Sequence, residues 1–233
     1  MESNTHLSDH FEDWLLFQNI IARDYMCHRE IIQTMHTWAR EHGKKGLRVL
    51  DLGCGDCYAA RSIFEGVDDV QYYGIDLSDQ ALGIARSNFE ASNWNIELLS
   101  GDITEMIRQL HGPFDFVIAG YALHYLENQK KSAVLDNIRL VLSPKGTLMI
   151  YDLLPRNGEK KDTYVQRVLD DADANWNLLS PEQLTSFRQH LENRAFPIDQ
   201  ATWQQFAFSS SLGKGELIFR DSAEQYGIIK FSN

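Results

Sequence analysis

The segment that constrains this chain most is a short apolar run that ends in a glycine-rich turn. The run Leu47-Arg-Val-Leu-Asp-Leu52 leads directly into Gly53-Cys-Gly55. A short apolar run bounded by glycine is typical of a buried strand, and glycine permits a sharp turn into a following helix. Further apolar runs at 70–75, 96–99, 114–119 and 147–151 alternate with helical patterns. This alternation predicts an α/β protein with a parallel sheet covered by helices on both faces.

The pattern changes after residue 152, and this change predicts the domain organisation. Helical patterns at 162–177, 181–192 and 199–209 are followed by two strand-like runs at 216–220 and 226–231. About sixty residues separate the fifth strand from this pair, whereas a parallel crossover needs only about a dozen. We therefore expect a helical cap inserted before the last two strands. The expected parts are N-terminal helices at 1–45 that close over the ligand, a ligand-binding core at 46–152 and 213–233, and the cap at 153–212.

Charge and composition argue against several classes of partner. The net charge is −11, and the basic pairs Lys44-Lys45 and Lys130-Lys131 are too short to form the stripe on which nucleic-acid binding usually depends. No apolar run is long enough to cross a bilayer, and the polar residues Met1–His6 lack the apolar core of a signal peptide. We expect a cytoplasmic protein, a monomer or a homodimer, with neither nucleic acid nor a membrane as its partner.

Three chemistries use a turn like Gly53-Cys-Gly55, and two of them fit poorly. A dinucleotide fingerprint needs a third small residue where this chain has Tyr58, and Asp51 and Asp56 would repel the pyrophosphate. A phosphate-binding Walker loop needs Gly-Lys-Ser/Thr, which Gly213-Lys214-Gly215 does not supply. The remaining ligand class carries a positive amine, which an acidic residue before the glycines would attract.

Acidic residues at successive strand ends point to one extended ligand. Asp51, Asp76 and Asp102 end or follow the first three predicted strands, so they are expected at the same edge of the sheet. A carboxylate at Asp76 is placed to accept both ribose hydroxyls of a nucleoside. Asp102 is placed to accept from an adenine amine, with Leu77 and Ile103 on either side of the base. The pattern predicts an adenosyl ligand.

These residues lie in motifs that resemble those of a known family. Val49–Gly55, Gly74–Ser78, Gly101–Ile103, Phe114–Gly120 and Leu142–Thr147 resemble, in order, the motifs of class I S-adenosylmethionine-dependent methyltransferases. The resemblance implies an enzyme with a seven-stranded, mostly parallel, doubly wound Rossmann-like sheet whose last strand is antiparallel. It implies S-adenosyl-L-methionine as the cofactor and no metal. Cys57 is a departure, since the family usually has glycine there. The cofactor-binding residues it implies are Asp51, Gly53, Gly55, Asp76, Leu77, Asp102, Ile103 and Gly120.

The resemblance also suggests where the methyl acceptor binds. His124 follows the fourth predicted strand, where the family's loop faces the transferred methyl, so it is the candidate general base. Ala119-Gly-Tyr-Ala122 lacks the Asn/Asp-Pro-Pro-Tyr/Phe pattern of enzymes that methylate base amines of nucleic acids, which favours methylation of O or N on a small molecule. In the cap, Arg194 and Trp176 are further candidates. The acceptor-binding residues we expect are Tyr25, Tyr121, Tyr125 and Arg156.

Three other functions stay open at this point. A protein-directed methyltransferase is the nearest variant, and a non-catalytic adenosyl-binding module would bind the cofactor without an acceptor pocket. A thiol-disulfide protein would use Cys54 and Cys57, whose spacing at a helix start suits such a centre. Acidic neighbours do not lower a thiol pKa, however, and one Cys-x-x-Cys pair without a second is weak evidence for zinc.

Overall fold

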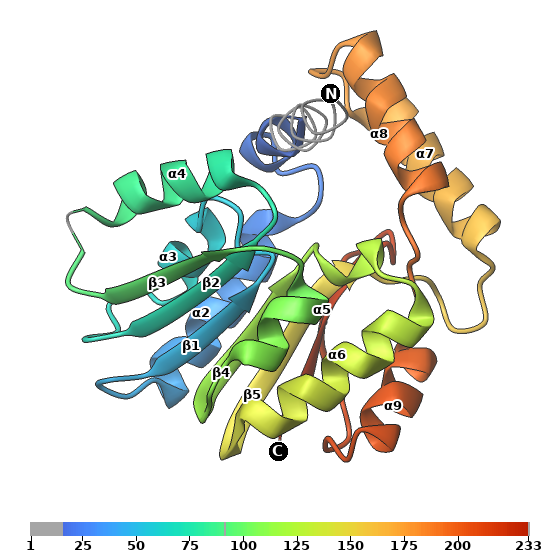
Figure 1. The fold of residues 1–233 in the computed structure, drawn as a ribbon. Coiled ribbons are helices and arrows are strands. Elements are labelled where there is room, and N and C mark those ends of the chain that lie inside the picture. Colours follow the sequence, from blue (N-terminus) through green and yellow to red (C-terminus); the bar gives the residue numbers. More distant parts are fainter. Residues whose placement is uncertain (1–15, 91, 233) are drawn as a thin grey trace, which may run out of the picture.

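The computed structural model describes residues 16–90 and 92–232, and within them a single sheet organises the fold. The strand order is β3-β2-β1-β4-β5-β7-β6 (Figure 1). Neighbouring strands are parallel except around β7, which is antiparallel to both β5 and β6. The predicted seven-stranded, mostly parallel sheet is therefore confirmed. The strands are β1 (Arg48–Leu52), β2 (Gln71–Asp76), β3 (Asn95–Ser100), β4 (Phe114–Gly120), β5 (Leu142–Leu153), β6 (Glu216–Arg220) and β7 (Tyr226–Ser232).

The order of the strands places a ligand site at one edge of the sheet. The chain moves outward from β1 through β2 to β3 and then returns to β4 on the other side of β1. Ligands bind at such a reversal, beyond the carboxyl ends of the strands. The register aligns Ile75 of β2 with Leu52 and Leu99, so the turns after β1, β2 and β3 emerge side by side.

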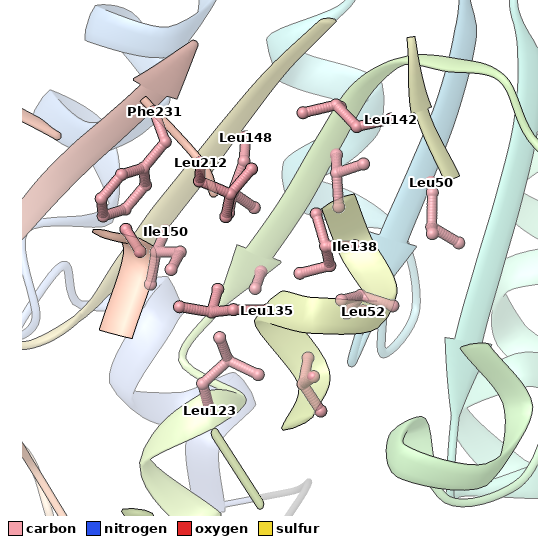
Figure 2. Packing of buried hydrophobic residues seen from close by; sticks show 14 of the residues in the cluster. Leu50, Leu52, Leu123, Leu135, Ile138, Leu142, Leu148, Ile150, Leu212 and Phe231 are labelled. Atoms are coloured by element: carbon pink, nitrogen blue, oxygen red, sulfur yellow. The ribbon is translucent and has the colours of Figure 1, made fainter. Parts of the chain in front are cut away.

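Helices cover both faces of the sheet because the strand residues are apolar on both faces. One face packs against α2 (His28–His42), α3 (Tyr58–Ile63) and α4 (Asp79–Phe89). The opposite face packs against α6 (Asn128–Val141) and α9 (Gln200–Ser209), with α5 (Ile103–Met106) and η1 (Ile107–Gln109) beside them. Figure 2 shows this second layer, in which Leu135 and Ile138 of α6 meet Leu148 and Ile150 of β5.

A separate apolar cluster joins the cap to the N-terminal segment. The cap helices are α7 (Lys161–Asn175) and α8 (Pro181–Asn193), and α8 begins with the predicted capping box of Ser180 and Gln183. Leu16 and Ile20, in the helical residues 16–22, share a buried cluster with α7 and α8 (Figure 1). The expected N-terminal helices are thus described from residue 16 onward, and residues 1–15 lie outside the described part.

The third helix of the predicted cap belongs to the core instead. We expected residues 153–212 to form the cap, but α9 packs against α6. Trp203 and Ala207 of α9 are buried in the same cluster as Leu135 and Ile138. The amphipathic pattern identified the helix correctly, but it did not reveal which apolar surface the helix would cover. Among the described helices, none is long and apolar enough to span a membrane.

The burial of α9 predicts a difference between two aromatic residues of that helix. Trp203 is 1% exposed, whereas Phe208 is 85% exposed. Trp203→Ala should lower the free energy of unfolding by about 3–5 kcal/mol, because it leaves a cavity against the sheet. Phe208→Ala should change it by no more than about 0.5 kcal/mol. Urea unfolding followed by circular dichroism measures both, and equal losses would show that α9 is not part of the core.

Candidate functional site

A cavity of about 530 Å³ lies at the carboxyl edge of the strands. This volume is within the range of small-molecule sites, about 300–1,000 Å³. One side is formed by the turns after β1, β2 and β3, and the other by the N-terminal segment, the loop after β4 and the end of α8. The turns contribute Gly53, Gly55, Asp76, Leu77, Ser78, Asp102 and Ile103. The other side contributes Phe17, Ile21, Met26, His28, Tyr121, Ala122, Tyr125, Leu126 and Arg194.

The glycine turn has the backbone conformation that glycine allows. Gly53 and Gly55 have φ angles of 78° and 54°. A Cβ on Gly53 would lie 2.4 Å from the Cβ of Ala122, so a side chain does not fit at that position. Cys57 also has a positive φ, 61°. Glycine adopts this left-handed conformation at no steric cost, which explains why the family that the sequence resembles usually has glycine there. Cys57 adopts the same conformation although it has a Cβ.

Asp76 lies at the centre of the polar side of the cavity. Its Oδ2 accepts a hydrogen bond from the Gly55 amide and its Oδ1 accepts one from the Ser78 amide, each at 2.8 Å. These two bonds join the turn after β1 to the start of α4. Asp76 thus lies at the cavity, as the sequence predicted, and its role toward a ribose stays a prediction.

Asp102, Leu77 and Ile103 form the neighbouring part of the wall. Asp102 caps α5, because its Oδ1 accepts from the Thr104 amide at 2.7 Å and from the Thr104 hydroxyl at 2.5 Å. Asp102 also lines the cavity. Leu77 is 52% exposed and lines the cavity beside Ile103. The structure thus brings together six of the eight predicted cofactor residues: Gly53, Gly55, Asp76, Leu77, Asp102 and Ile103.

Asp51 does not line this cavity, which corrects our expectation that it would hold the ligand directly. It is only 5% exposed and lies below the glycine turn. The Tyr72 hydroxyl donates to its Oδ2 at 2.7 Å. Burial raises the pKa of Asp51 to about 7, the Tyr72 hydrogen bond opposes the shift, and the nearby charge of Asp76 adds to it.

Three other predicted residues also lie away from the cavity. Gly120 faces the ring of Tyr151, where a Cβ would come within 1.9 Å of Cζ. Tyr25 stacks on Trp176 with ring centroids 4.9 Å apart and forms part of the cap's packing. Arg156 pairs with Glu224 at 2.7 Å on the surface. The cation that the structure does bring to the cavity is Arg194.

His124 is also misassigned as a base at the cavity. It is 2% exposed, and it follows β4 in the short helix η2 (Leu123–Tyr125). Its Nδ1 lies 2.6 Å from Asp152 Oδ1, and its Nε2 lies 3.4 Å from His190 Nε2. Both ring nitrogens therefore have protein partners, and among the described residues its neighbours Tyr121, Ala122 and Tyr125 line the cavity in its place.

The sequence reasoning missed the contribution of the N-terminal segment. Met26 and His28 line the cavity, and His28 contacts the ring of Tyr121 with centroids 4.9 Å apart. Burial lowers the pKa of His28 to about 4, so its ring is neutral near pH 7. A lone histidine at a helix start carries no signal of this role, because only the packing of the segment over the sheet brings it there.

The thiols have surroundings that suppress redox chemistry. Cys54 and Cys57 are close enough to share a hydrogen bond, and this contact, burial, and the charges of Asp51 and Asp76 raise the pKa of Cys54 well above its ordinary value. A reactive thiolate needs the opposite environment. Within the described residues, no group of three or more His, Cys, Asp or Glu side chains is arranged to hold a metal ion.

The buried Asp51 predicts a pH-dependent stability difference. Its folded pKa, about 7, lies above the ordinary 3.8. Its stabilising contribution is therefore complete below pH 3.8 and is lost as the pH rises to about 7. The natural protein should lose stability across this window, whereas Asp51→Asn has no group that titrates there. The free energy of unfolding of Asp51→Asn, minus that of the natural protein, should therefore rise by up to about 1.4 kcal/mol per pH unit and level off above pH 7. Urea titrations at stepped pH measure the difference; a difference that does not vary with pH would contradict the assignment.

Known proteins share this sequence pattern and its arrangement. Residues 49–146 match the profile of a family described as a methyltransferase domain. A carboxy-S-adenosyl-L-methionine synthase from Shewanella sp. (strain ANA-3) is 25% identical, over 90% of this chain and 94% of the relative. A malonyl-(acyl-carrier protein) O-methyltransferase from Halalkalibacterium halodurans is 27% identical, over 53% of this chain and 45% of the relative.

The fold is shared with solved structures as well. Magnesium protoporphyrin IX methyltransferase from Synechocystis PCC 6803, solved with bound SAH, matches with a TM-score of 0.61 and 17% identity, over 88% of this chain and 83% of that chain. At so low an identity the likeness concerns the fold alone. Taken together, the family profile, the relatives and the shared fold support a class I S-adenosylmethionine-dependent methyltransferase, an enzyme whose cofactor is S-adenosyl-L-methionine.

Proposed function

We propose that this protein transfers a methyl group from S-adenosyl-L-methionine to an oxygen or nitrogen of a small-molecule acceptor. The observation that carries this proposal is a single cavity with two chemically different sides. The side formed by the strand-end turns is polar and acidic. The side formed by the cap, the loop after β4 and the N-terminal segment is mostly apolar and aromatic, with Arg194 as its cation. Such a cavity has space for a nucleoside cofactor and for a second molecule against it.

The residues of the polar side fit the cofactor. Asp76 would accept hydrogen bonds from the ribose hydroxyls, and Asp102 would accept one from the adenine amine. Leu77 and Ile103 would cover the two faces of the base, and the turn at Gly53 and Gly55 would let the methionine part approach the backbone closely. When bound, the cofactor supplies a methyl carbon that its positive sulfur activates toward a nucleophile.

The residues of the opposite side would orient the acceptor and exclude water. Tyr121 is fixed in place, since its hydroxyl donates to the Met26 carbonyl at 2.5 Å and its amide donates to the Tyr151 carbonyl at 2.8 Å. Phe17, Ile21 and Leu126 add apolar surface. Holding two reactants in line is sufficient for large rate accelerations without a general base, which fits a site that His124 does not reach.

The cavity also bears on the alternative functions. An apolar compartment beside the cofactor's place is what a non-catalytic adenosyl-binding module would lack. The cover formed by α8 and residues 16–22 favours a small acceptor over a protein chain, because a protein side chain would have to enter beneath these helices. The raised pKa of Cys54 disfavours the thiol-disulfide alternative.

The role of Asp76 predicts a loss of cofactor affinity. Asp76→Ala should weaken binding of S-adenosylhomocysteine by at least about tenfold, because hydrogen bonds to a charged group are worth about 1.5–3 kcal/mol. Titration calorimetry measures the affinity, with Arg156→Ala as a control that should bind normally. Asp76→Asn, which keeps one acceptor oxygen for the turn, separates loss of the ligand contact from distortion of the loop. Unchanged affinity in Asp76→Ala would refute the ribose assignment.

Two observations favour a second candidate, synthesis of a carboxylated S-adenosylmethionine. The relative named carboxy-S-adenosyl-L-methionine synthase aligns over nearly the whole of both chains. In addition, Arg194 places a permanent positive charge at the cavity. An arginine binds a carboxylate well because its planar fork matches the two oxygens. A carboxyl group attached at the reacting carbon would find its partner there.

This second candidate makes a distinct prediction about Arg194. Protein purified from cells should retain a nucleoside heavier than S-adenosylmethionine by one carboxyl group, detectable by mass spectrometry after denaturation. Arg194→Ala should lose most of this species, whereas the surface variant Arg156→Ala should keep it. Recovery of S-adenosylmethionine or S-adenosylhomocysteine alone from the natural chain would exclude the second candidate and leave methyl transfer.

A further inference from the structure

A buried chain of three polar side chains links the cap to the core behind the cavity. Asp152 near the end of β5, His124 in η2 and His190 in α8 are 3%, 2% and 3% exposed. Asp152 Oδ2 accepts from the His124 amide at 2.9 Å, and Asp152 Oδ1 lies 2.6 Å from His124 Nδ1. His124 Nε2 lies 3.4 Å from His190 Nε2. Neither the cofactor side nor the acceptor side of the cavity contains any of these three residues.

The proton positions along this chain follow from its ends. If Asp152 accepts at Oδ1, a neutral His124 carries its hydrogen on Nδ1 and a lone pair on Nε2. His190 must then donate from Nε2, which leaves its Nδ1 without a proton. That atom is buried and has no partner among the described residues, as expected for a bare lone pair rather than a stranded N–H group. The two hydrogen bonds therefore run in one direction: His190 donates to His124, and His124 donates to Asp152.

Other polar contacts join the same two segments. The Phe196 amide donates to the His124 carbonyl at 2.7 Å. The buried Lys131 ammonium donates to the Phe196 carbonyl at 2.6 Å and also to the Leu126 carbonyl. The end of α8 is thus fastened to the loop after β4 along residues 190–196 and 124–131.

Residues of the cavity wall lie inside this fastened region. Tyr125 stacks on His124 with ring centroids 4.4 Å apart and meets the edge of His190 at 5.0 Å. Phe17, from the N-terminal segment, meets His190 edge-on at 4.9 Å. Arg194 follows His190 by one helical turn. His190 therefore contacts two residues of the cavity wall, Phe17 and Tyr125, and lies one helical turn before a third, Arg194.

We propose that His190 is a positioning residue that sets the acceptor side of the cavity by donating a hydrogen bond to His124. This link holds Phe17, Tyr125 and Arg194 in place against the core. The inference deepens the proposed function and rests on it in one respect, since it takes this side of the cavity to be the acceptor's place.

The same geometry makes the link sensitive to acid. A second proton on His190 would enter at Nδ1, which is buried and has no partner among the described residues, and it would place a positive charge close to Arg194. The charged and titratable groups around His190 are His124, Asp152 behind it, and Arg194. Burial, His124 and Arg194 together lower the pKa of His190 to about 3. Its contribution to stability is thus complete above the ordinary value of 6.5 and is lost as the pH falls toward 3.

A matched pair of substitutions separates the donor from the bulk of the ring. His190→Gln places an amide donor at a similar reach and does not titrate, whereas His190→Leu fills similar space without a donor. Hydrogen exchange by NMR should show the Phe196 amide exchanging about tenfold faster in His190→Leu, the worth of one buried hydrogen bond, and near the natural rate in His190→Gln. The Tyr125 and Phe17 ring signals should move in the leucine variant alone.

Ring nitrogen shifts provide a test that does not depend on any variant folding. In the natural chain, ¹⁵N NMR should show His124 protonated at Nδ1 and His190 protonated at Nε2. The opposite tautomers would overturn the proposal. So would a Phe196 amide that exchanges at the same rate in His190→Leu as in the natural protein, or one that exchanges as fast in His190→Gln as in His190→Leu. Calorimetry with S-adenosylhomocysteine runs in parallel: failure of the natural chain to bind it would count against the proposed function and leave these readouts intact.

Discussion

The Asp76 carboxylate is the interaction on which the site depends. It accepts from the Gly55 amide after β1 and from the Ser78 amide after β2, and so ties two adjacent strand-end turns together. The Gly53 and Cys54 amides, which donate to the Ile75 carbonyl at 2.8 and 3.0 Å, support the same connection between the two turns. A charge-assisted hydrogen bond of this kind is worth more than a neutral one. Asp76 also lines the cavity, so the residue that organises the two turns is the one to which we assign the ribose in the proposed function.

The opposite side of the cavity is assembled from distant parts of the chain. The helical residues 16–22, the loop after β4 and the end of α8 meet there, and each packs against the others. Polar contacts at their junction are buried and directional, which fixes one arrangement more strictly than apolar packing does.

The sequence predicted the sheet and six of the residues that line the strand-end side of the cavity, because both rest on local patterns. The strands β1 and β4 were visible as apolar runs, and Asp76 and Asp102 were visible as acids where strands stop. The failures have specific causes. Asp51 lies within β1, where side chains alternate, and its neighbours Leu50 and Leu52 face the α6 layer. Asp51 therefore points to the other face, toward Tyr72, and the alternation already present in the sequence was the signal that was overlooked.

The remaining errors concern side chains whose partners are far away in the chain. His124 was predicted at the cavity from its place after β4, but Asp152 and His190 turn its ring inward. Arg156 was chosen over Arg194 as the acceptor's cation, although nothing local distinguishes two exposed arginines in a predicted cap. Likewise, α9 was recognised as a helix, but its apolar face covers α6 and not the cavity.

By itself, the sequence determined the order of strands and helices, the glycine turn, and the acids at the strand ends, because periodicity and turn chemistry act over a few residues. Only the tertiary structure decided which side chains reach the cavity, that the N-terminal segment and α8 share its wall, and that two histidines bind each other instead of a ligand. Those outcomes depend on packing between segments that are distant along the chain: His124 and His190 are 66 residues apart, and Tyr25 and Leu178 are 153 residues apart. No local pattern encodes such contacts.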